Sequence, residues 1–285
     1  SGGGGTTLDV TYLVSEGLGT SSGAGATGWG AGTWGLSTWG TARAVTVDVE
    51  LSQWSLNLWG EDLIATVRNE DIYFWDLSVG LSTRAALVSG IAGAGDVPTK
   101  NRMTIISFPD RHLISAGCVP YGGSAIDPMQ VRWSTQEDYD MWTPTATNTA
   151  GGQRLQIGTK IVTVASTREE TFISTDEAVY GMQFIGPPFT FSFRLIGTNC
   201  GAIGYNAMAN VESNLYWMGK NDFYFYNGNI SEMPCPVKHY VFDRIRRNQV
   251  DKFFVAHNAQ FNEICWFYVS TDNSDESPEP DSYVC

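Results

Sequence analysis

The chain has 285 residues, and its 17 Lys and Arg against 30 Asp and Glu give a formal net charge of −13 at pH 7. This charge disfavours nonspecific nucleic-acid binding, which needs cations to displace counterions from phosphates, although it suits a wall past which DNA slides without adhering. The 13% aromatic residues and 31 Gly, with only 16% charged residues, favour strands over helices.

Residues 1–44 are predicted to be an arm or loop rich in Gly, Ser and Thr, with one short strand at Leu8–Val14. Within it Trp29, Trp34 and Trp39 recur every five residues, a period that fits neither a strand face nor a helix face. Because exposed indoles would form an adhesive patch, we expect these Trp to be buried against their own domain or against a neighbouring subunit. Sugar stacking is a third alternative. The three Trp are therefore candidate subunit-interface residues.

Residues 45–270 are predicted to form a β-propeller-like body built from antiparallel four-stranded units. The clearest β-hairpin is Asn214–Gly228, in which two aromatic-rich runs flank a turn of Gly, Lys, Asn and Asp. Similar hairpins are predicted at Asp62–Trp75, Met103–Ser115 and Thr171–Met182. The second strands begin at residues 71, 111, 177 and 222, so their spacings are 40, 66 and 45 residues. An imperfect repeat of about 40–50 residues is typical of four-stranded propeller blades, and a jelly roll or sandwich is the alternative.

Two further elements are predicted within this body. Ala44–Leu58 has the alternation of a strand. Pro236–Asn248 is the one short helix, because Val237, Val241 and Ile245 lie four residues apart and would form an apolar stripe facing a core.

The end of this helix and the end of the chain carry opposite charges. Arg244, Arg246 and Arg247 form a local basic cluster, which fits intrachain pairs with acidic loops, a subunit interface or a collar that touches DNA. Residues 271–285 are predicted to be an acidic linker, Thr271–Ser282, followed by the start of a further strand at Tyr283–Cys285. Since the chain stops inside that element, we expect a longer polypeptide.

No catalytic motif is found, so an enzyme, a metal centre and a cofactor are not expected. The three His are isolated in sequence, and the sequence has no H-E-x-x-H, G-x-S-x-G, Walker or dinucleotide-binding pattern. Glu137–Asp140 lacks the spaced acidic ladder of a calcium loop. A pair of glycosidase carboxylates chosen among Asp110, Glu137, Asp138 and Asp176 would be arbitrary, given the number of acids available.

The cysteine count is odd, and no C-x-x-C pair occurs among Cys118, Cys200, Cys235, Cys265 and Cys285. Free buried thiols in a reducing compartment are therefore expected over a disulfide framework or a zinc site. No run of about 18 apolar residues exists, so no membrane span is predicted.

Four stretches taken together resemble a known group of proteins. They are Gly28–Gly40, Leu58–Asp76, Asp138–Val162 and Asn214–Gly228. They are similar to tailed-phage structural proteins, the tail nozzle or packaged-DNA-stabilisation proteins at the base of short tails, and the resemblance covers most of residues 28–270. It implies a propeller-bearing subunit, made in the host cytoplasm and assembled in the virion as a six-fold homo-oligomeric ring under the adaptor. Such a ring continues the DNA channel and helps retain the genome. The resemblance brings no catalytic residues.

The sequence therefore predicts a structural subunit of a phage tail, past which DNA moves without sequence-specific binding. The alternative is a carbohydrate-binding propeller, either a lectin or a glycosidase, whose surface aromatic residues would stack on a sugar. A third hypothesis, a scaffold that binds host proteins, differs from the first in its partners.

Overall fold

The structure is a computed structural model that describes residues 20–24, 44–48, 51–108, 110–274 and 278–285. The chain divides into two units, Ser1–Ser52 and Gln53–Cys285. In the first unit, strands β1 (Thr20–Ala24) and β2 (Ala44–Asp48) pair antiparallel. The predicted strand at Leu8–Val14 and the three Trp of the arm, Trp29, Trp34 and Trp39, lie outside the described residues.

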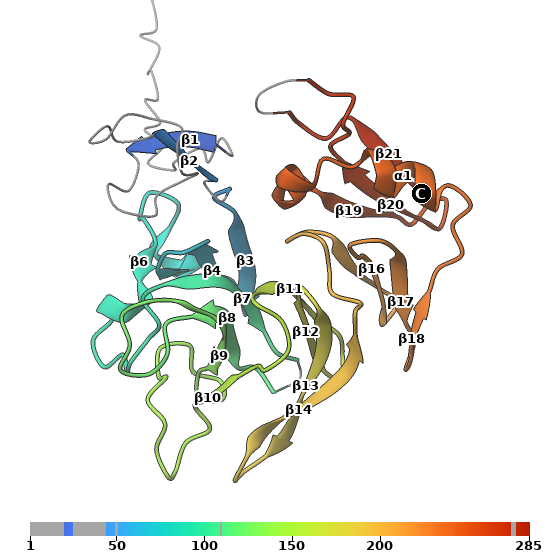
Figure 1. Ribbon diagram of the computed structural model, residues 1–285. Helices are drawn as coiled ribbons and strands as arrows, with labels where there is room; N and C mark the ends of the chain where they lie inside the picture. The colour runs from blue at the N-terminus through green and yellow to red at the C-terminus, as the bar shows by residue number, and fades with distance from the viewer. Residues whose placement is uncertain (1–19, 25–43, 49–50, 109, 275–277) are drawn as a thin grey trace, which may run out of the picture. The chain divides into compact units, whose positions relative to one another are not determined.

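The second unit contains five consecutive antiparallel sheets, which we number blades 1 to 5 (Figure 1). Blade 1 consists of β3 (Trp54–Trp59), β4 (Asp62–Val67), β5 (Ile72–Trp75) and β6 (Ala86–Leu87). Blade 2 consists of β7 (Asn101–Ile106), β8 (Leu113–Cys118), β9 (Asp127–Trp133) and β10 (Gly151–Arg154). Blade 3 consists of β11 (Ile161–Ser166), β12 (Thr171–Thr175), β13 (Ala178–Gly186) and β14 (Thr190–Thr198). Blade 4 consists of β15 (Met208–Val211), β16 (Asn214–Met218), β17 (Phe223–Tyr226) and β18 (Ile230–Glu232). Blade 5 consists of β19 (Phe254–Asn258), β20 (Glu263–Tyr268) and β21 (Ser282–Val284).

In every blade the strands pair in the order in which they occur in the chain, and the first strands of successive blades contact one another around an axis. This arrangement is a five-bladed β-propeller, so the predicted all-β propeller is confirmed. The predicted four-stranded unit holds for blades 1 to 4, whereas the described part of blade 5 has three strands.

The blades repeat more regularly than the predicted hairpins. Their first strands begin at residues 54, 101, 161, 208 and 254, so the spacings are 47, 60, 47 and 46 residues. The predicted hairpin at Met103–Ser115 is β7–β8, the first and second strands of its blade, whereas the other three predicted hairpins are second and third strands. That difference in phase produced the uneven spacings. The long interval in blade 2 contains the connection of residues 134–150 between β9 and β10.

Apolar clusters fill four of the junctions between neighbouring blades. The cluster between blades 2 and 3 contains Trp133 and Phe191, and the one between blades 3 and 4 contains Phe172 and Trp217. The other two clusters lie between blades 1 and 2 and between blades 4 and 5. Because a blade packs on both faces, neighbours along one strand can both be buried, which is how the aromatic-rich sequences of these strands are accommodated.

Close packing between blades 3 and 4 also depends on a glycine. A Cβ on Gly201 would lie 2.4 Å from the carbonyl oxygen of Thr175 and 2.6 Å from the backbone nitrogen of Glu177. These contacts are to backbone atoms, so they cannot be relieved by a side-chain rotation. The connection from β14 to β15 therefore rests directly on the β12–β13 turn.

Two predicted elements differ in extent from the observed ones. The single strand expected over Ala44–Leu58 is wrong, because β2 and β3 belong to different sheets and residues 51–53 are not in a strand. The expected helix is shorter than predicted. It consists of α1 (Lys238–Arg244), which ends because Ile245 has extended backbone angles, followed by the 3₁₀ helix η3 (Arg247–Lys252). Two other 3₁₀ helices are η1 (Leu77–Val79) and η2 (Val88–Gly90).

The apolar stripe predicted for this helix is partly correct. Val241 and Ile245 are buried in the cluster between blades 4 and 5, together with Phe242. Val237 is half-exposed, because it precedes the first helical residue and lies outside the packed turn.

The C-terminal residues form part of blade 5. The strand predicted to start at Tyr283 is β21, which pairs with β20. The acidic stretch before it is fixed to the body at its described ends, since Asp281 accepts hydrogen bonds of 2.7 Å from both the backbone N–H and the hydroxyl of Ser270.

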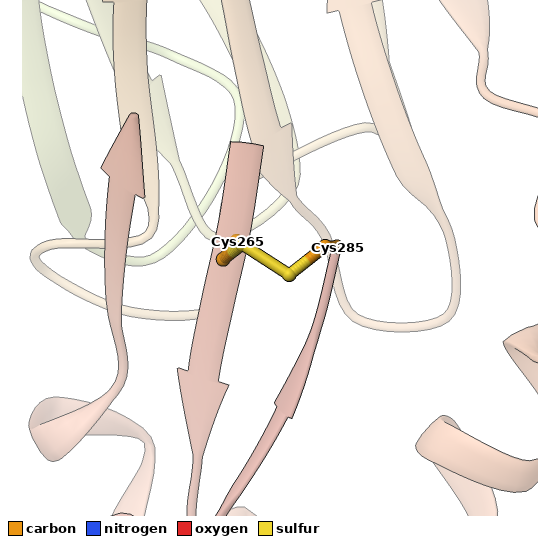
Figure 2. The surroundings of a disulfide bond; sticks show 2 residues. All are labelled: Cys265 and Cys285. Atoms are coloured by element: carbon orange, nitrogen blue, oxygen red, sulfur yellow. A yellow bond between two sulfur atoms is a disulfide. The ribbon is translucent and has the colours of Figure 1, made fainter. Parts of the chain in front are cut away.

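The prediction of free thiols is wrong for two of the five cysteines. Cys265 on β20 and Cys285 after β21 form a disulfide (Figure 2). The register that pairs Trp266 with Val284 places them opposite each other on adjacent strands. Cys118, Cys200 and Cys235 have free thiols, and the first two are buried. Burial raises the pKa of the Cys118 thiol to about 12, so it is not a nucleophile at neutral pH.

Candidate functional site

The first strands of all five blades surround an axial cavity of about 410 Å³. Each strand contributes side chains to its wall because successive residues of a strand point to opposite faces, and the strands of neighbouring blades converge at the axis. The polar lining residues are Ser55, Asn57, Thr104, Thr163, Tyr205 and Asn206. The aromatic lining residues besides Tyr205 are Trp54 and Phe254, and aliphatic residues complete the wall.

The described lining of this axial cavity contains no Asp, Glu, Lys, Arg or His. The acidic charge of the chain is therefore not carried by these wall residues. A hydrogen-bond network connects the polar ones, since Asn57 donates to the Thr104 carbonyl at 3.0 Å and the Thr104 backbone N–H donates to Ser55 Oγ at 3.2 Å. The hydroxyls of Thr66 and Thr104 lie 2.9 Å apart. The cavity offers neutral hydrogen-bonding groups beside apolar surface.

Tyr205 links the wall across the axis. It belongs to the connection that leads into blade 4, and its hydroxyl lies 2.5 Å from Ser55 Oγ in blade 1. Burial raises the pKa of Tyr205, while the hydrogen bond with Ser55 and the nearby charges of Arg68 and Arg102 oppose that rise. The phenol therefore remains neutral and its hydroxyl stays available as a donor.

Blades 1 and 5 are joined by polar contacts beside Tyr205. The Arg68 guanidinium lies over the Tyr205 ring, 5.2 Å from its centroid, and donates to both carboxylate oxygens of Asp251 at 2.9 and 3.2 Å. The Gln53 side chain donates to the Asp251 carbonyl at 2.5 Å. The Arg68 side chain is buried whereas Asp251 is partly exposed, so this two-point ion pair is partly sheltered from solvent and stabilises the closure of the ring.

Replacing Asp251 with Asn tests this closure. The substitution removes the charge that faces a buried guanidinium, and we expect a loss of about 1–2 kcal/mol in the free energy of unfolding, less than for a fully buried pair because Asp251 is partly exposed. Urea unfolding measures the loss. The matched control is Asp272→Asn, which breaks the exposed pair with Arg244 and is expected to cost about 0–0.5 kcal/mol. Equal effects of the two variants would contradict a structural role for the Arg68–Asp251 pair.

The junction between blades 1 and 5 has no apolar cluster among the described residues, and three residues at this junction, Trp54, Leu56 and Phe254, also line the axial cavity. Trp54, Leu56 and Leu58 alternate along β3 on the face turned away from blade 2, and 62% of Leu56 and 72% of Leu58 are exposed. On blade 5, Phe254 and Tyr283 are exposed on the face turned away from blade 4. We name this junction, bounded by these five residues, the seam.

The seam could not be predicted from the sequence, although part of its signal is present there. The run from Trp54 to Trp59 alternates apolar and polar residues, as a half-buried strand does. That alternation shows that one face of β3 is apolar. It does not show whether another sheet covers that face, and here the cluster with blade 2 buries the opposite face instead.

The predicted basic cluster makes intrachain contacts. Arg244 donates to Asp272 at 3.1 Å and lies over the Tyr240 ring. Arg246 donates to the Asn273 carbonyl at 2.9 Å. Arg247 donates to the Lys220 carbonyl at 3.0 Å. These contacts agree with intrachain pairing, one of the alternatives from the sequence. A role of the three Arg, or of the arm's Trp, in a subunit interface stays a prediction.

The four carboxylates considered for glycoside hydrolysis do not line the axial cavity. Asp176 accepts from the backbone and hydroxyl of Thr159 at 2.7 and 2.8 Å. Burial opposes ionisation of Asp176, but these hydrogen bonds, one from the Lys160 backbone and the charge of Lys220 outweigh it and lower its pKa. Asp176 therefore acts as a turn-stabilising anion, and the other three lie in or beside the connection of residues 134–150.

The 134–150 connection contains two neighbouring carboxyls, those of Asp138 and Asp140. Burial, a hydrogen bond with Asp138 and the negative charge of Asp138 raise the pKa of Asp140 to about 6. Between them, Tyr139 stacks on Phe74 with ring centroids 4.2 Å apart. The loop is thus held on blade 1 by an aromatic contact while two carboxyls share limited space.

The Asp138 and Asp140 carboxyls make the free energy of unfolding depend on pH. Because the pKa of Asp140 is raised in the folded state, its ionisation destabilises the fold progressively as the pH rises from about 4 to about 6. We expect Asp140→Asn to raise the melting temperature at about pH 8 and to bring little gain at about pH 4. Thermal unfolding at the two pH values measures this. Glu137→Gln, which neutralises an exposed neighbouring acid, is the control, and an equal gain for it would contradict the explanation.

The structure also assembles a buried hydrogen-bond chain that the sequence did not indicate. Asp110 Oδ2 lies 2.7 Å from His112 Nδ1 and accepts from Ser107 Oγ at 2.6 Å, and His112 Nε2 lies 3.0 Å from Thr149 Oγ1. The order of groups is that of a nucleophile, a base and an orienting acid. However, His112 has no exposed surface and its ring packs against Phe191. The chain of hydrogen bonds therefore holds the 134–150 connection on the turn between β7 and β8.

Within the described residues, no group of three or more His, Cys, Asp or Glu could hold a metal ion. A search of the same residues for a helix with the length and apolar character needed to cross a membrane finds none.

The fold and these sites define the class of the protein as a five-bladed β-propeller whose axial cavity has no charged side chain in its described lining. Comparison with models of protein families and with curated proteins finds no match.

Proposed function

We propose that the chain is a structural subunit of a phage tail, a nozzle or hub protein that forms a homo-oligomeric ring around the DNA channel. The ring of this proposal lies below the portal and the adaptor of the tail, and it helps to retain and deliver the genome. The resemblance of four stretches of the sequence to such proteins motivates the proposal. In this proposal the subunit assembles with its copies and catalyses no reaction.

The observation that carries the proposal is the distribution of exposed apolar residues. Since the strands of a blade alternate in direction, the first-to-second and third-to-fourth connections of all blades emerge on one face of the propeller, which we name the apolar face. Large exposed side chains occur in these connections, among them Leu81, Phe108, Phe189 and Phe261. Exposed apolar groups gathered on one face are typical of protein interfaces.

The opposite face exposes fewer large apolar side chains, and Val237 and Tyr240 are among them. Its connections are joined by ion pairs, including Lys238 with Asp222 at 2.6 Å and Arg244 with Asp272 at 3.1 Å. Copies with a net charge of −13 repel one another, so contact through uncharged surfaces is favoured. The seam and the tip of the β13–β14 hairpin, Ile185–Phe189, are such surfaces.

The test is the location of the protein in particles of the phage that encodes it. Mass spectrometry of purified virions and electron microscopy with a specific antibody would find the protein and place the label at the tail. A protein absent from purified virions would contradict the proposal. Labelling on the capsid surface alone would also contradict it.

A second candidate, a carbohydrate-binding propeller, is favoured by the axial cavity. Trp54 and Phe254 could stack on a sugar ring, and Asn57, Thr163 and Asn206 provide neutral hydrogen-bonding groups. The lectin form is favoured over the glycosidase form, since no carboxylate is among the described lining residues. A glycan array discriminates the two candidates, because the structural function predicts no saturable binding.

A further inference from the structure

We propose that the tip of the β13–β14 hairpin of one copy inserts into the seam between blades 1 and 5 of the next copy, and that this contact builds the ring. The inference rests on the proposed function and names the two surfaces that would meet. Both surfaces are apolar, exposed and unexplained by packing within the described residues.

The inserting element is well suited to be a rigid knob. β13 and β14 have nine residues each and form the longest hairpin of the propeller (Figure 1). Its base is anchored, because Ala178 to Met182 are buried. Its tip exposes Ile185 and Phe189, the latter by 75%. Pro187 and Pro188 between them have fixed φ angles and no N–H groups, so the tip loses little entropy and leaves few donors unsatisfied on burial.

The receiving element has the form of an uncovered sheet-packing surface. On blade 5, Phe254, Phe267 and Tyr283 are neighbours across three strands, and the first two rings stack with centroids 4.7 Å apart. On blade 1, Leu56 heads a cross-strand row that ends at Leu87, and both are exposed. The four other junctions of the propeller are filled by sheet-on-sheet packing, so a β-hairpin is the kind of element that fits this one.

Charge and symmetry both favour a second copy as the occupant. Neither Ile185–Phe189 nor the seam residues Trp54, Leu56, Leu58, Phe254 and Tyr283 include a charged side chain. The contact therefore brings two acidic copies together without placing like charges side by side. The tip lies on blade 3 and the seam lies between blades 1 and 5, so the contact is heterologous, and repeating it generates a ring when the rotation closes.

Two charge-introducing variants test the contact. Phe189→Asp destroys the knob and leaves the seam intact, whereas Leu56→Asp does the reverse. Because both positions are exposed in the subunit, we expect each variant to fold and to remain monomeric when measured alone by mass photometry, with its self-association weakened at least tenfold. An equimolar mixture should form a dimer with one copy of each and no ring, since only one intact knob and one intact seam remain to meet. The control is Val237→Asp, an exposed apolar residue in the β18–β19 connection on the opposite face of the propeller, which should keep the ring.

The outcomes separate this inference from the proposed function. Rings that persist in both variants would overturn the inference and leave the function standing, because the interface would lie elsewhere. Monomeric variants that give no mixed dimer would overturn the inference too. A wild-type protein that is monomeric would overturn both. Circular dichroism checks folding, and Phe189→Ser with Leu56→Ser replaces the pair if an Asp variant unfolds.

Discussion

Substitution of Trp217 by Ala is expected to lower the free energy of unfolding by about 3–5 kcal/mol, the largest effect of the changes considered. Trp217 is fully buried on β16 in the cluster between blades 3 and 4. Its indole N–H donates to the Cys200 carbonyl at 2.6 Å, and its ring stacks on Tyr224. The variant would lose apolar burial, leave a cavity between two blades and leave the buried Cys200 carbonyl without this donor. Urea unfolding followed by circular dichroism measures the loss.

The control for this experiment is Phe261→Ala. Phe261 is an aromatic residue in the β19–β20 turn and is mostly exposed, so its truncation is expected to cost about 0.5 kcal/mol or less. Similar losses for the two variants would show that the blades do not pack through Trp217, and would contradict the radial stacking described for the fold.

The Asp110→Asn variant is expected to lose about 2–3 kcal/mol at neutral pH. Asp110 is buried, and burial alone would raise its pKa, but hydrogen bonds from His112 and Ser107 outweigh burial and hold the pKa below its ordinary value. A carboxyl with a lowered folded-state pKa stabilises the fold above the unfolded-state value of about 4, and this stabilisation is lost as the pH falls through the folded-state pKa. The difference from the wild type should therefore shrink below about pH 4.

The pH series distinguishes this effect from a general loss of packing. Asn is nearly the size of protonated Asp, so the variant should resemble the wild type in acid, where the wild-type carboxyl is neutral. Asp243→Asn, at an exposed position of α1, is the control and is expected to change stability little at any pH. A deficit of Asp110→Asn that persists unchanged in acid would contradict a stabilising role for the Asp110 charge.

The sequence predicted the propeller because its hairpins are signalled locally. In Asn214–Gly228 the aromatic runs and the turn residues lie next to one another, and the observed β16 and β17 match them. The phase of the repeat could not be predicted as well. β7–β8 has the same local signature as the second-to-third hairpins of other blades, and only pairing with β9 and β10 shows that it comes first.

The sites were less predictable because their members are distant in sequence. Thr149 reaches His112 only after the 134–150 connection folds back on blade 2. Cys265 and Cys285 are separated by 20 residues and meet because β21 joins β20 in one register. Trp54, Leu56 and Leu58 alternate with polar residues as in a strand. Whether another sheet covers their face depends on how blades 1 and 5 are arranged, and no described sheet does. Such features follow from tertiary packing, which local patterns do not contain.

The most direct test of assembly into a ring is the stoichiometry of the purified wild-type protein, measured by native mass spectrometry over a range of concentrations. A subunit whose uncharged surfaces meet copies of itself in a closed ring should give one dominant oligomer of fixed copy number, for which the resemblance implies six. A monomer at every concentration, or an open series of oligomers without a preferred size, would contradict it.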